Sequence, residues 1–407
     1  MASALLLIAV VLVFCFLVYK RTYRNAWSHL PSPGFQLPFF GHPQLLLDTS
    51  DPVKYSWDLY KKFSQKGLLY IKIFTFKSVI VGDFETLKYL FNHPDVQNRT
   101  GDNFHTDSTI KVIKEERDGL PGPLEGVINS QGSVWAEQRR FTLRTLRDFG
   151  FGKAGIKSKF TFCKLLLLGY YINSGMEEMI QEELMKFRGL LAKFENEPVD
   201  FVGKFNLPIL NALWRVTVGE NFEYDDLFLV DIVKRMGEWI QRLGRTEVLI
   251  LYSFPWIAKF WPSFLGRNED IKINRDLKNM MLKSIENHKK TIDTNEPRDY
   301  IDKYLIEIEN TKDPNSSFFG ANGIENLAAN LLDLFLAGSE TTSTTLTWAV
   351  LYMVRYPEVQ LKVQQELDSV IGQYRVPSLT DRQNLPYTEV CNIPVNSLFT
   401  TLTYRLS

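Results

Sequence analysis

The pattern of hydrophobic and polar positions along the 407 residues predicts a mainly helical protein with a small β-sheet. The stretch 324–356 is long and apolar and is predicted to form a helix. Residues 68–81 are rich in β-branched and aromatic side chains and predict two short strands with a turn at 75–77. A short helix over 84–92 is predicted to follow and to stop at Pro94. Because no low-complexity linker or internal repeat interrupts this pattern beyond the N-terminal region, we expect one large α+β domain.

The N-terminal region begins with an apolar stretch, residues 1–19, that carries no charged side chain. As a helix it would be roughly 28 Å long, about the thickness of a hydrocarbon core. The basic residues Lys20, Arg21 and Arg24 follow it, so the positive-inside rule places the N-terminus in the lumen and the bulk of the chain in the cytosol. We therefore expect a single-pass transmembrane anchor over 1–19, with a cleaved signal peptide as the alternative. Residues 20–42 then form a basic and proline-rich hinge that contains Pro31, Pro33 and Pro38.

A second apolar stretch, 248–265, is unusually aromatic and is interrupted by Pro255 and Pro262. These prolines exclude a spanning helix. The length of the stretch and its tryptophan and tyrosine side chains suit an element that lies in the membrane interface. Ordinary core packing of the aromatic side chains is the alternative.

The composition narrows the classes of function further. There are 47 basic and 47 acidic residues, so the net charge is zero and gives no reason to expect a nucleic-acid partner. Three cysteines in a chain of this length argue against a disulfide framework and fit a reducing compartment.

The long apolar helix carries an unusual run of small and hydroxyl residues, Ala337-Gly338-Ser339-Glu340-Thr341-Thr342. Glycine inside a helix costs about 1 kcal/mol relative to alanine. Threonine hydroxyls can donate to the carbonyl four residues earlier and bend the helix. We therefore expect the helix to open its backbone here toward something polar, such as water, a ligand or dioxygen. A tightly packed helix crossing is the alternative.

A second run lies far upstream, Trp135-Ala136-Glu137-Gln138-Arg139-Arg140-Phe141. Trp135 and Arg139 are four residues apart, so they share one face of a helix. An indole N–H and a guanidinium on one face can bind an anion such as a carboxylate. A surface stack of the two side chains is the alternative.

In their order and spacing, the two runs resemble the cytochrome P-450 superfamily of haem-thiolate monooxygenases, and most of all its microsomal family 2 type. Other stretches agree with the same family, namely 30–34, 37–42, 141–150, 297–302 and 385–389. The resemblance extends from the anchor to about residue 390. It implies that residues 43–390 form a cytochrome P450 domain, mainly α with a small β-sheet.

The resemblance implies a haem cofactor, whose propionate would be held by Trp135 and Arg139. Electrons would come from NADPH through NADPH-cytochrome P450 reductase, with cytochrome b5 as a further partner. In this family the basic stripe of Arg140, Arg144 and Arg147 lies on the side where the acidic reductase docks. A solvated basic face is the alternative interpretation of that stripe.

The resemblance also assigns roles to the run in the long helix. Ala337 and Gly338 would form the wall beside the iron and leave room for dioxygen. Thr341 and Glu340 would be the catalytic residues and would move protons during oxygen activation. The implied substrates are apolar small molecules such as fatty acids, steroids and xenobiotics. The implied location is the endoplasmic reticulum membrane, with the catalytic domain facing the cytosol.

Two stretches depart from the family pattern. Residues 156–175 form a dense apolar insert where the family runs almost directly into the next helix. This insert could lie on the membrane or disturb the helix junction, but we favour an unspliced or mispredicted segment. The tail 391–407 contains neither the family's Glu-x-x-Arg pair nor its Phe-x-x-Gly loop, which presents the cysteine that binds iron.

None of the three cysteines is predicted to replace that ligand, and no residue is assigned as a metal ligand. Cys15 lies in the anchor, Cys163 in the insert, and Cys391 in the tail without a glycine-rich turn. Because the axial thiolate favours O–O cleavage, we expect a C-terminally truncated family member that is inactive alone. A non-catalytic, membrane-anchored protein that binds hydrophobic ligands or interacts with intact relatives is the alternative. Rapid degradation of the product is a third possibility.

Overall fold

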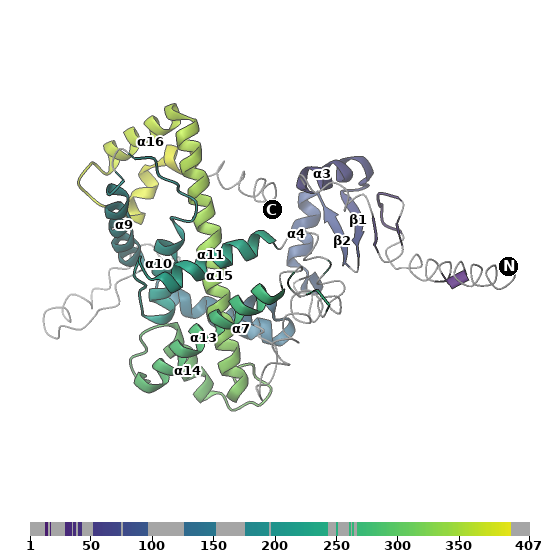
Figure 1. Ribbon diagram of the computed structural model, residues 1–407, viewed down its shortest axis with the longest axis horizontal. Coiled ribbons are helices and arrows are strands. Elements are labelled where there is room, and N and C mark those ends of the chain that lie inside the picture. Colours follow the sequence, from purple (N-terminus) through teal and green to yellow (C-terminus); the bar gives the residue numbers. More distant parts are fainter. Residues whose placement is uncertain are drawn as a thin grey trace. The chain divides into compact units, whose positions relative to one another are not determined.

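The computed structural model describes residues 13–14, 17, 29–34, 36–37, 40–42, 52–74, 76–96, 126–151, 176–194, 197–242, 250, 260–261, 263 and 267–391. The chain divides into two compact units, whose elements are drawn in Figure 1. The first unit comprises residues 1–98, 241–266 and 401–407, and the second comprises 99–240 and 267–400. The second unit is therefore built from two separate lengths of chain.

The first unit contains a β-hairpin, in which β1 (Leu68–Ile73) pairs antiparallel with β2 (Phe76–Val81). The prediction of two strands is confirmed. The predicted turn at 75–77 is placed too late, because Phe76 and Lys77 already pair with β1. The hairpin turns tightly because Phe74 adopts a φ of 49°, the left-handed conformation that two-residue hairpin loops need.

Helices flank the hairpin in sequence: α3 (Pro52–Phe63), α4 (Phe84–Asn92) and the short 3₁₀ helix η1 (Pro94–Val96). The bounds of α4 confirm the short helix predicted over 84–92. The helix begins where Asp83 caps it, with Asp83 Oδ2 accepting a hydrogen bond of 2.7 Å from the Thr86 amide.

The described residues of the second unit form helices and no strand. The helices are α6 (Gly126–Asn129), α7 (Gly132–Asp148), α9 (Met176–Ala192), α10 (Asn206–Val218), α11 (Leu227–Arg242), α13 (Arg267–Thr291), α14 (Tyr300–Asn310), α15 (Gly320–Arg355), α16 (Pro357–Val370) and η3 (Leu379–Asn384). The helix predicted over 324–356 is confirmed as α15, which begins four residues earlier. The described chain is thus mainly helical with a two-stranded sheet.

Helix α15 is the central element of the second unit and runs past α10, α13 and α14 (Figure 1). The core lies where these helices meet. Phe335 of α15 is fully buried and packs edge-on against Trp214 of α10, with ring centroids 5.5 Å apart. Edge-to-face aromatic pairs of this kind add to the stability that burial of apolar surface provides. The core therefore fixes α10 against the middle of α15.

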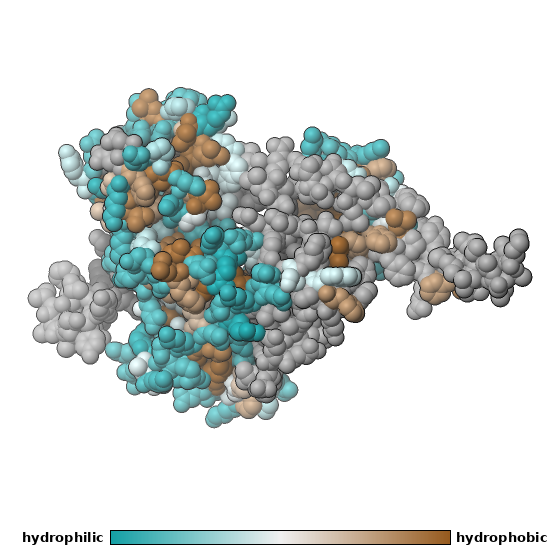
Figure 2. Space-filling view, in the orientation of Figure 1, coloured by the Kyte–Doolittle hydropathy of each residue, from teal (hydrophilic) through white to brown (hydrophobic). Residues whose placement is uncertain are grey.

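Large apolar side chains remain at the surface near the C-terminal end of α15 and on α16. Leu351, Val354 and Leu361 are 52%, 68% and 55% exposed. Figure 2 shows hydrophobic residues interspersed with hydrophilic ones on the visible face of the molecule. Exposed apolar groups of this size favour association with other surfaces.

Several predicted segments fall wholly or largely outside the described residues. In the part of the chain that the structure describes, no helix is long and apolar enough to cross a bilayer. The predicted anchor 1–19 is described only at residues 13, 14 and 17, and the insert 156–175 is not described. The tail is described only at Cys391. Within the aromatic stretch 248–265, Phe260 and Trp261 are 68% and 63% exposed.

Candidate functional site

Helix α7 presents the predicted pair of Trp135 and Arg139. The guanidinium carbon of Arg139 lies 5.5 Å from the centroid of the Trp135 ring, so the shared helix face is confirmed. Trp135 is half-buried, whereas Arg139 is exposed and forms no ion pair with a carboxylate among the described residues. A stacked, exposed guanidinium keeps its N–H groups available for an anion.

A buried hydrogen-bond network holds α7 in place, and it centres on Gln138. The Gln138 Oε1 atom accepts hydrogen bonds of 2.7 Å from Tyr304 Oη and of 2.7 Å from Asn330 Nδ2. Its Nε2 atom donates to Ser317 Oγ at 2.8 Å. Buried polar groups satisfied in this way rigidify their surroundings. The network ties α7 to α14 and α15 and so fixes Arg139, the next residue along α7.

The run in α15 divides between two faces of that helix. Ala337 and Thr341 are exposed and lie one turn apart on one face. Thr341 Oγ1 donates to the Ala337 carbonyl at 2.8 Å, and Thr345 Oγ1 donates to the Thr341 carbonyl at 2.9 Å. The predicted back-bonding of threonine hydroxyls is confirmed. The Thr341 hydroxyl has used its proton, so its oxygen remains available to accept a hydrogen bond.

The opposite face of the run packs against α10. Ser339 is fully buried, and a Cβ built on Gly338 would clash with Leu213 Cδ2 of α10. The absence of a side chain at Gly338 therefore permits a close crossing of α10 and α15. At Gly338, the structure therefore agrees with the alternative interpretation of the run, which is a tightly packed helix crossing.

Glu340 lies at the border between the two faces and is half-buried. Its Oε2 atom accepts a hydrogen bond of 3.1 Å from Asn206 Nδ2 at the start of α10. Burial raises the pKa of the Glu340 carboxyl, and the hydrogen bond from Asn206 partly offsets that rise. The carboxyl thus contacts the start of α10.

Asp333 is a residue of this site that sequence reasoning missed. It lies one turn before Ala337, is buried, and accepts a hydrogen bond of 2.8 Å from the Ile128 amide of α6. A Cβ on Gly126 would clash with Asp333 Oδ2, so the start of α6 rests directly on this carboxyl. Burial raises the pKa of Asp333 to about 7, although the backbone hydrogen bonds oppose the shift. The signal in the sequence was a lone acidic residue in an apolar run.

The structure thus brings Trp135 together with Arg139, Ala337 with Thr341, and Gly338 and Glu340 with α10. Gln138 joins α7 to α15 through Asn330, and α6 contacts both helices. Among the described residues, no hydrogen bond or ion pair joins the α7 pair to the run 337–342. In the described part of the chain, the Arg139 guanidinium and the face formed by Ala337 and Thr341 are both exposed.

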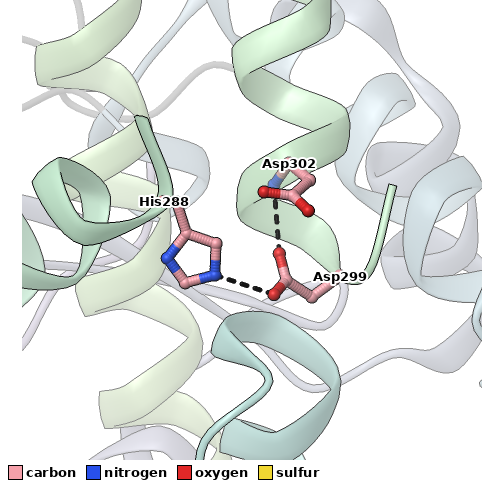
Figure 3. A group of neighbouring side chains, drawn as sticks. All are labelled: His288, Asp299 and Asp302. Carbon is pink, nitrogen blue, oxygen red and sulfur yellow. Dashed lines mark hydrogen bonds and ion pairs between the residues drawn. The ribbon is translucent and has the colours of Figure 1, made fainter. Parts of the chain in front are cut away.

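A separate cluster of His288, Asp299 and Asp302 places one possible metal-ligand atom from each residue within 4.8 Å of the others (Figure 3). Its oxygen atoms are already engaged. Asp299 Oδ1 accepts from the Asp302 amide and Oδ2 contacts His288 Nε2 at 2.8 Å. Arg298 donates to both carboxyl oxygens of Asp302, at 2.6 and 2.8 Å. The cluster therefore serves to cap α14 and to join it to α13, and we assign no metal to it.

Comparison with known proteins shows the family to which the chain is similar. A family model described as Cytochrome P450 matches residues 31–391. The chain is 36% identical over 378 residues to Cytochrome P450 2J1 of Oryctolagus cuniculus, covering 92% of this chain and 67% of the relative. It is 35% identical over 368 residues to Cytochrome P450 2J2 of Homo sapiens, covering 90% and 65%. It is 30% identical over 389 residues to Cytochrome P450 2C8 of Homo sapiens, covering 93% and 70%. The chain spans about two thirds of the length of these curated relatives.

Proposed function

Because the chain belongs to the cytochrome P450 family, we propose that its family function is the haem-dependent monooxygenation of apolar small molecules. None of its three cysteines is predicted to bind the haem iron, so we propose that these residues do not complete the reaction alone. The observation that carries this proposal is a pair of exposed surfaces, which lie on two helices, α7 and α15, that a buried hydrogen bond joins. One is the exposed guanidinium of Arg139, and the other is the exposed Ala337–Thr341 face of α15. An anion site can bind the propionates at the edge of a haem, and a flat apolar wall can contact its face.

The residues of the second unit have distinct tasks in this proposal. A bound haem would supply dioxygen activation, which no amino-acid side chain provides. Arg139, stacked on Trp135, would hold a propionate of the haem by charge-assisted hydrogen bonds. Ala337 would form the wall beside the haem, because a small residue lets the macrocycle approach the helix. Gly338, where an added Cβ would meet Leu213 of α10, would contribute only its backbone to that wall. Asp333 orders α6 one turn before this wall.

Thr341 and Glu340 handle protons in the proposed reaction. The Thr341 hydroxyl donates to the Ala337 carbonyl, so its oxygen accepts a hydrogen bond from a water molecule or a substrate group at the exposed face. Burial raises the pKa of Glu340, which brings this carboxyl closer to the range in which it can both hold and release a proton near neutral pH. In this proposal Glu340 would supply the proton, and Thr341 would orient the group that receives it.

The substrates in this proposal are fatty acids, steroids or xenobiotics, and the enzyme faces the cytosol from the endoplasmic reticulum membrane. NADPH-cytochrome P450 reductase and cytochrome b5 supply the electrons. The reductase docking surface is supported by Arg140, Arg144 and Arg147, which are exposed on α7 and form no ion pair with a carboxylate among the described residues. A stripe of unpaired cations attracts an acidic partner and speeds its association.

The test is the absorbance of the full chain in membranes, reduced and treated with carbon monoxide, against the reduced sample. A strongly red-shifted Soret band indicates thiolate-ligated haem, so it supports monooxygenation by this chain and contradicts the expectation that the chain is inactive alone. Haem binding without that band contradicts monooxygenation by these residues alone. In that case a non-catalytic protein that binds hydrophobic ligands becomes the better description.

A further inference from the structure

Glu340 of α15 lies where that helix meets α10 and α11. Its role in proton handling does not by itself explain this position. On one side stands Asn206, the first residue of α10, which is buried and donates from Nδ2 to Glu340 Oε2 at 3.1 Å. On the other side lies Gly237 of α11, where a Cβ would stand 3.9 Å from Glu340 Oε1. The carboxyl is therefore bounded by an amide and by a position that carries no side chain.

The amide of Asn206 is held rigidly, because α10 is locked against α15 further along. Leu213 fills the space at Gly338, and Trp214 packs on Phe335. The backbone at Asn206 is also tied down, since its amide donates to the Gly203 carbonyl at 3.2 Å. A buried side chain on an anchored helix offers its donor at a fixed place.

We propose that Asn206 is a positioning residue for Glu340, which holds the carboxyl at the α10 border of the Ala337–Thr341 face and sets its proton affinity. An amide N–H donates to a carboxylate more strongly than to a carboxylic acid, so this contact favours the ionised form and opposes the effect of burial. Without Asn206 the carboxyl keeps its burial and loses its donor. This inference rests on the proposed function only for the use of the proton, because the geometry concerns the chain alone.

The experiment follows the protonation of Glu340 directly in the full-length chain by infrared spectroscopy. The stretching band of a protonated carboxyl that disappears in Glu340→Gln is assigned to Glu340 and titrated against pH. In Asn206→Leu, which keeps the branched shape of the side chain and removes the donor, the midpoint should rise by about one pH unit. This size is expected from a comparison of two free energies. A hydrogen bond to a charged group contributes at least as much free energy as the amount that shifts a pKa by one unit.

A matched control is Asn326→Leu. Asn326 is as buried as Asn206, and its Nδ2 donates to the Ser317 carbonyl at 2.9 Å. It lies on α15 roughly 20 Å from Glu340 along the helix. This control should leave the Glu340 midpoint unchanged. A midpoint that moves equally in both variants, or in neither, overturns the proposal.

A second variant and a second measurement ensure that the experiment gives an answer even if Asn206→Leu does not fold or haem does not bind. If Asn206→Leu does not fold, Asn206→Ser provides a shorter polar side chain that cannot reach Glu340, and its midpoint should also rise. Haem is not needed for the titration, so a chain without a thiolate-type Soret band still answers the question. A raised midpoint without that band supports the positioning role and contradicts monooxygenation by this chain alone, whereas the band with an unchanged midpoint does the reverse.

Discussion

At the scale of single residues, His288 shows how a fixed set of partners determines a protonation state. Its Nδ1 atom faces the Ser284 carbonyl at 2.7 Å and its Nε2 atom faces Asp299 Oδ2 at 2.8 Å (Figure 3). A carbonyl and a carboxylate only accept hydrogen bonds, so both ring nitrogens must donate and the ring is an imidazolium. Burial lowers the pKa of His288, but the hydrogen bond and the charge of Asp299 outweigh it, and the pKa is raised.

This pair predicts a pH dependence of stability. A histidine with a raised pKa contributes stability that is fully present below its unfolded pKa of about 6.5 and is lost as pH rises through the higher folded pKa. The free energy of unfolding should therefore fall as pH increases above about 6.5. The groups around the ring are Asp299 and Asp302 of the α14 start, the neighbouring Arg298, and Gly219, the cap residue of α10, which lies close to Asp299.

The measurement is denaturant unfolding of wild type and His288→Gln across this pH range. The variant should lose about 1 to 3 kcal/mol at about pH 6, because a buried carboxyl loses its charged donor, and should show a flatter pH profile. His93→Gln is the control, since His93 lies 3.7 Å from the exposed Asp95 at the surface of the first unit. A His288→Gln profile as steep as that of wild type would falsify the imidazolium assignment.

At the scale of elements, the crossing of α10 and α15 depends on a glycine. Gly338→Ala should destabilise the chain by about 1 to 3 kcal/mol, because the added methyl group displaces Leu213 from a packed core. Gly189→Ala on α9 is the matched control. A Cβ at Gly189 meets no atom within 4 Å, so this change should stabilise the chain by about 0.5 to 1 kcal/mol.

Thermal unfolding of the two variants decides whether the crossing is tight. The double variant Leu213→Ala with Gly338→Ala should be more stable than the sum of the two single effects predicts, because the first change makes room for the second. If Gly338→Ala stabilises the chain as much as Gly189→Ala does, the close crossing is wrong.

A second element-scale prediction concerns the docking of α6 on Asp333. Asp333→Leu removes the acceptor for the Ile128 amide and should cost about 1 to 3 kcal/mol, whereas Asp333→Asn keeps an acceptor oxygen and should cost less. Amide hydrogen exchange at Val127 and Ile128 should become faster in Asp333→Leu and change little in Asp333→Asn. Equal exchange in wild type and Asp333→Leu would remove Asp333 from the docking site.

The elements also show what the sequence could predict. The hairpin strands, α4 and α15 follow from local patterns, namely β-branched runs, a capping residue and a long apolar stretch. The hairpin turn was misplaced because it depends on the positive φ of Phe74, a conformation that phenylalanine rarely adopts. Local sequence patterns determine which secondary-structure element forms, whereas a single backbone angle, the φ of Phe74, determines where the hairpin turns.

The residues that position the site were harder to predict. Gln138 bonds to Asn330, 192 positions away, and Asn206 bonds to Glu340, 134 positions away. No periodicity connects partners so distant in sequence. The local contacts of Trp135, Arg139 and Thr341 could be predicted because the partners lie one turn away on the same helix. Their supporting partners come from other helices and require the fold.

At the scale of the whole molecule, the second unit combines two separate lengths of chain around α15, and the candidate site uses both. Helices α6, α7 and α10 come from the part before residue 240, and α15 comes from the part after 267. Haem binding in the proposed position therefore depends on the assembly of the complete unit and not on one motif. A ligand that binds only the assembled unit should stabilise it by an amount that grows with the logarithm of the ligand concentration above Kd.

Haem titration of the 407-residue chain, followed by Soret absorbance, shows whether the α7 pair of Trp135 and Arg139 holds the haem. Wild type should bind haem saturably, and Arg139→Leu should bind about ten- to a hundredfold more weakly, because a charge-assisted contact to a propionate is lost. Arg144→Leu, which removes another exposed arginine of α7, should bind as wild type does. Equal affinity of wild type and Arg139→Leu would contradict the account, because the α7 pair would then have no part in holding the haem.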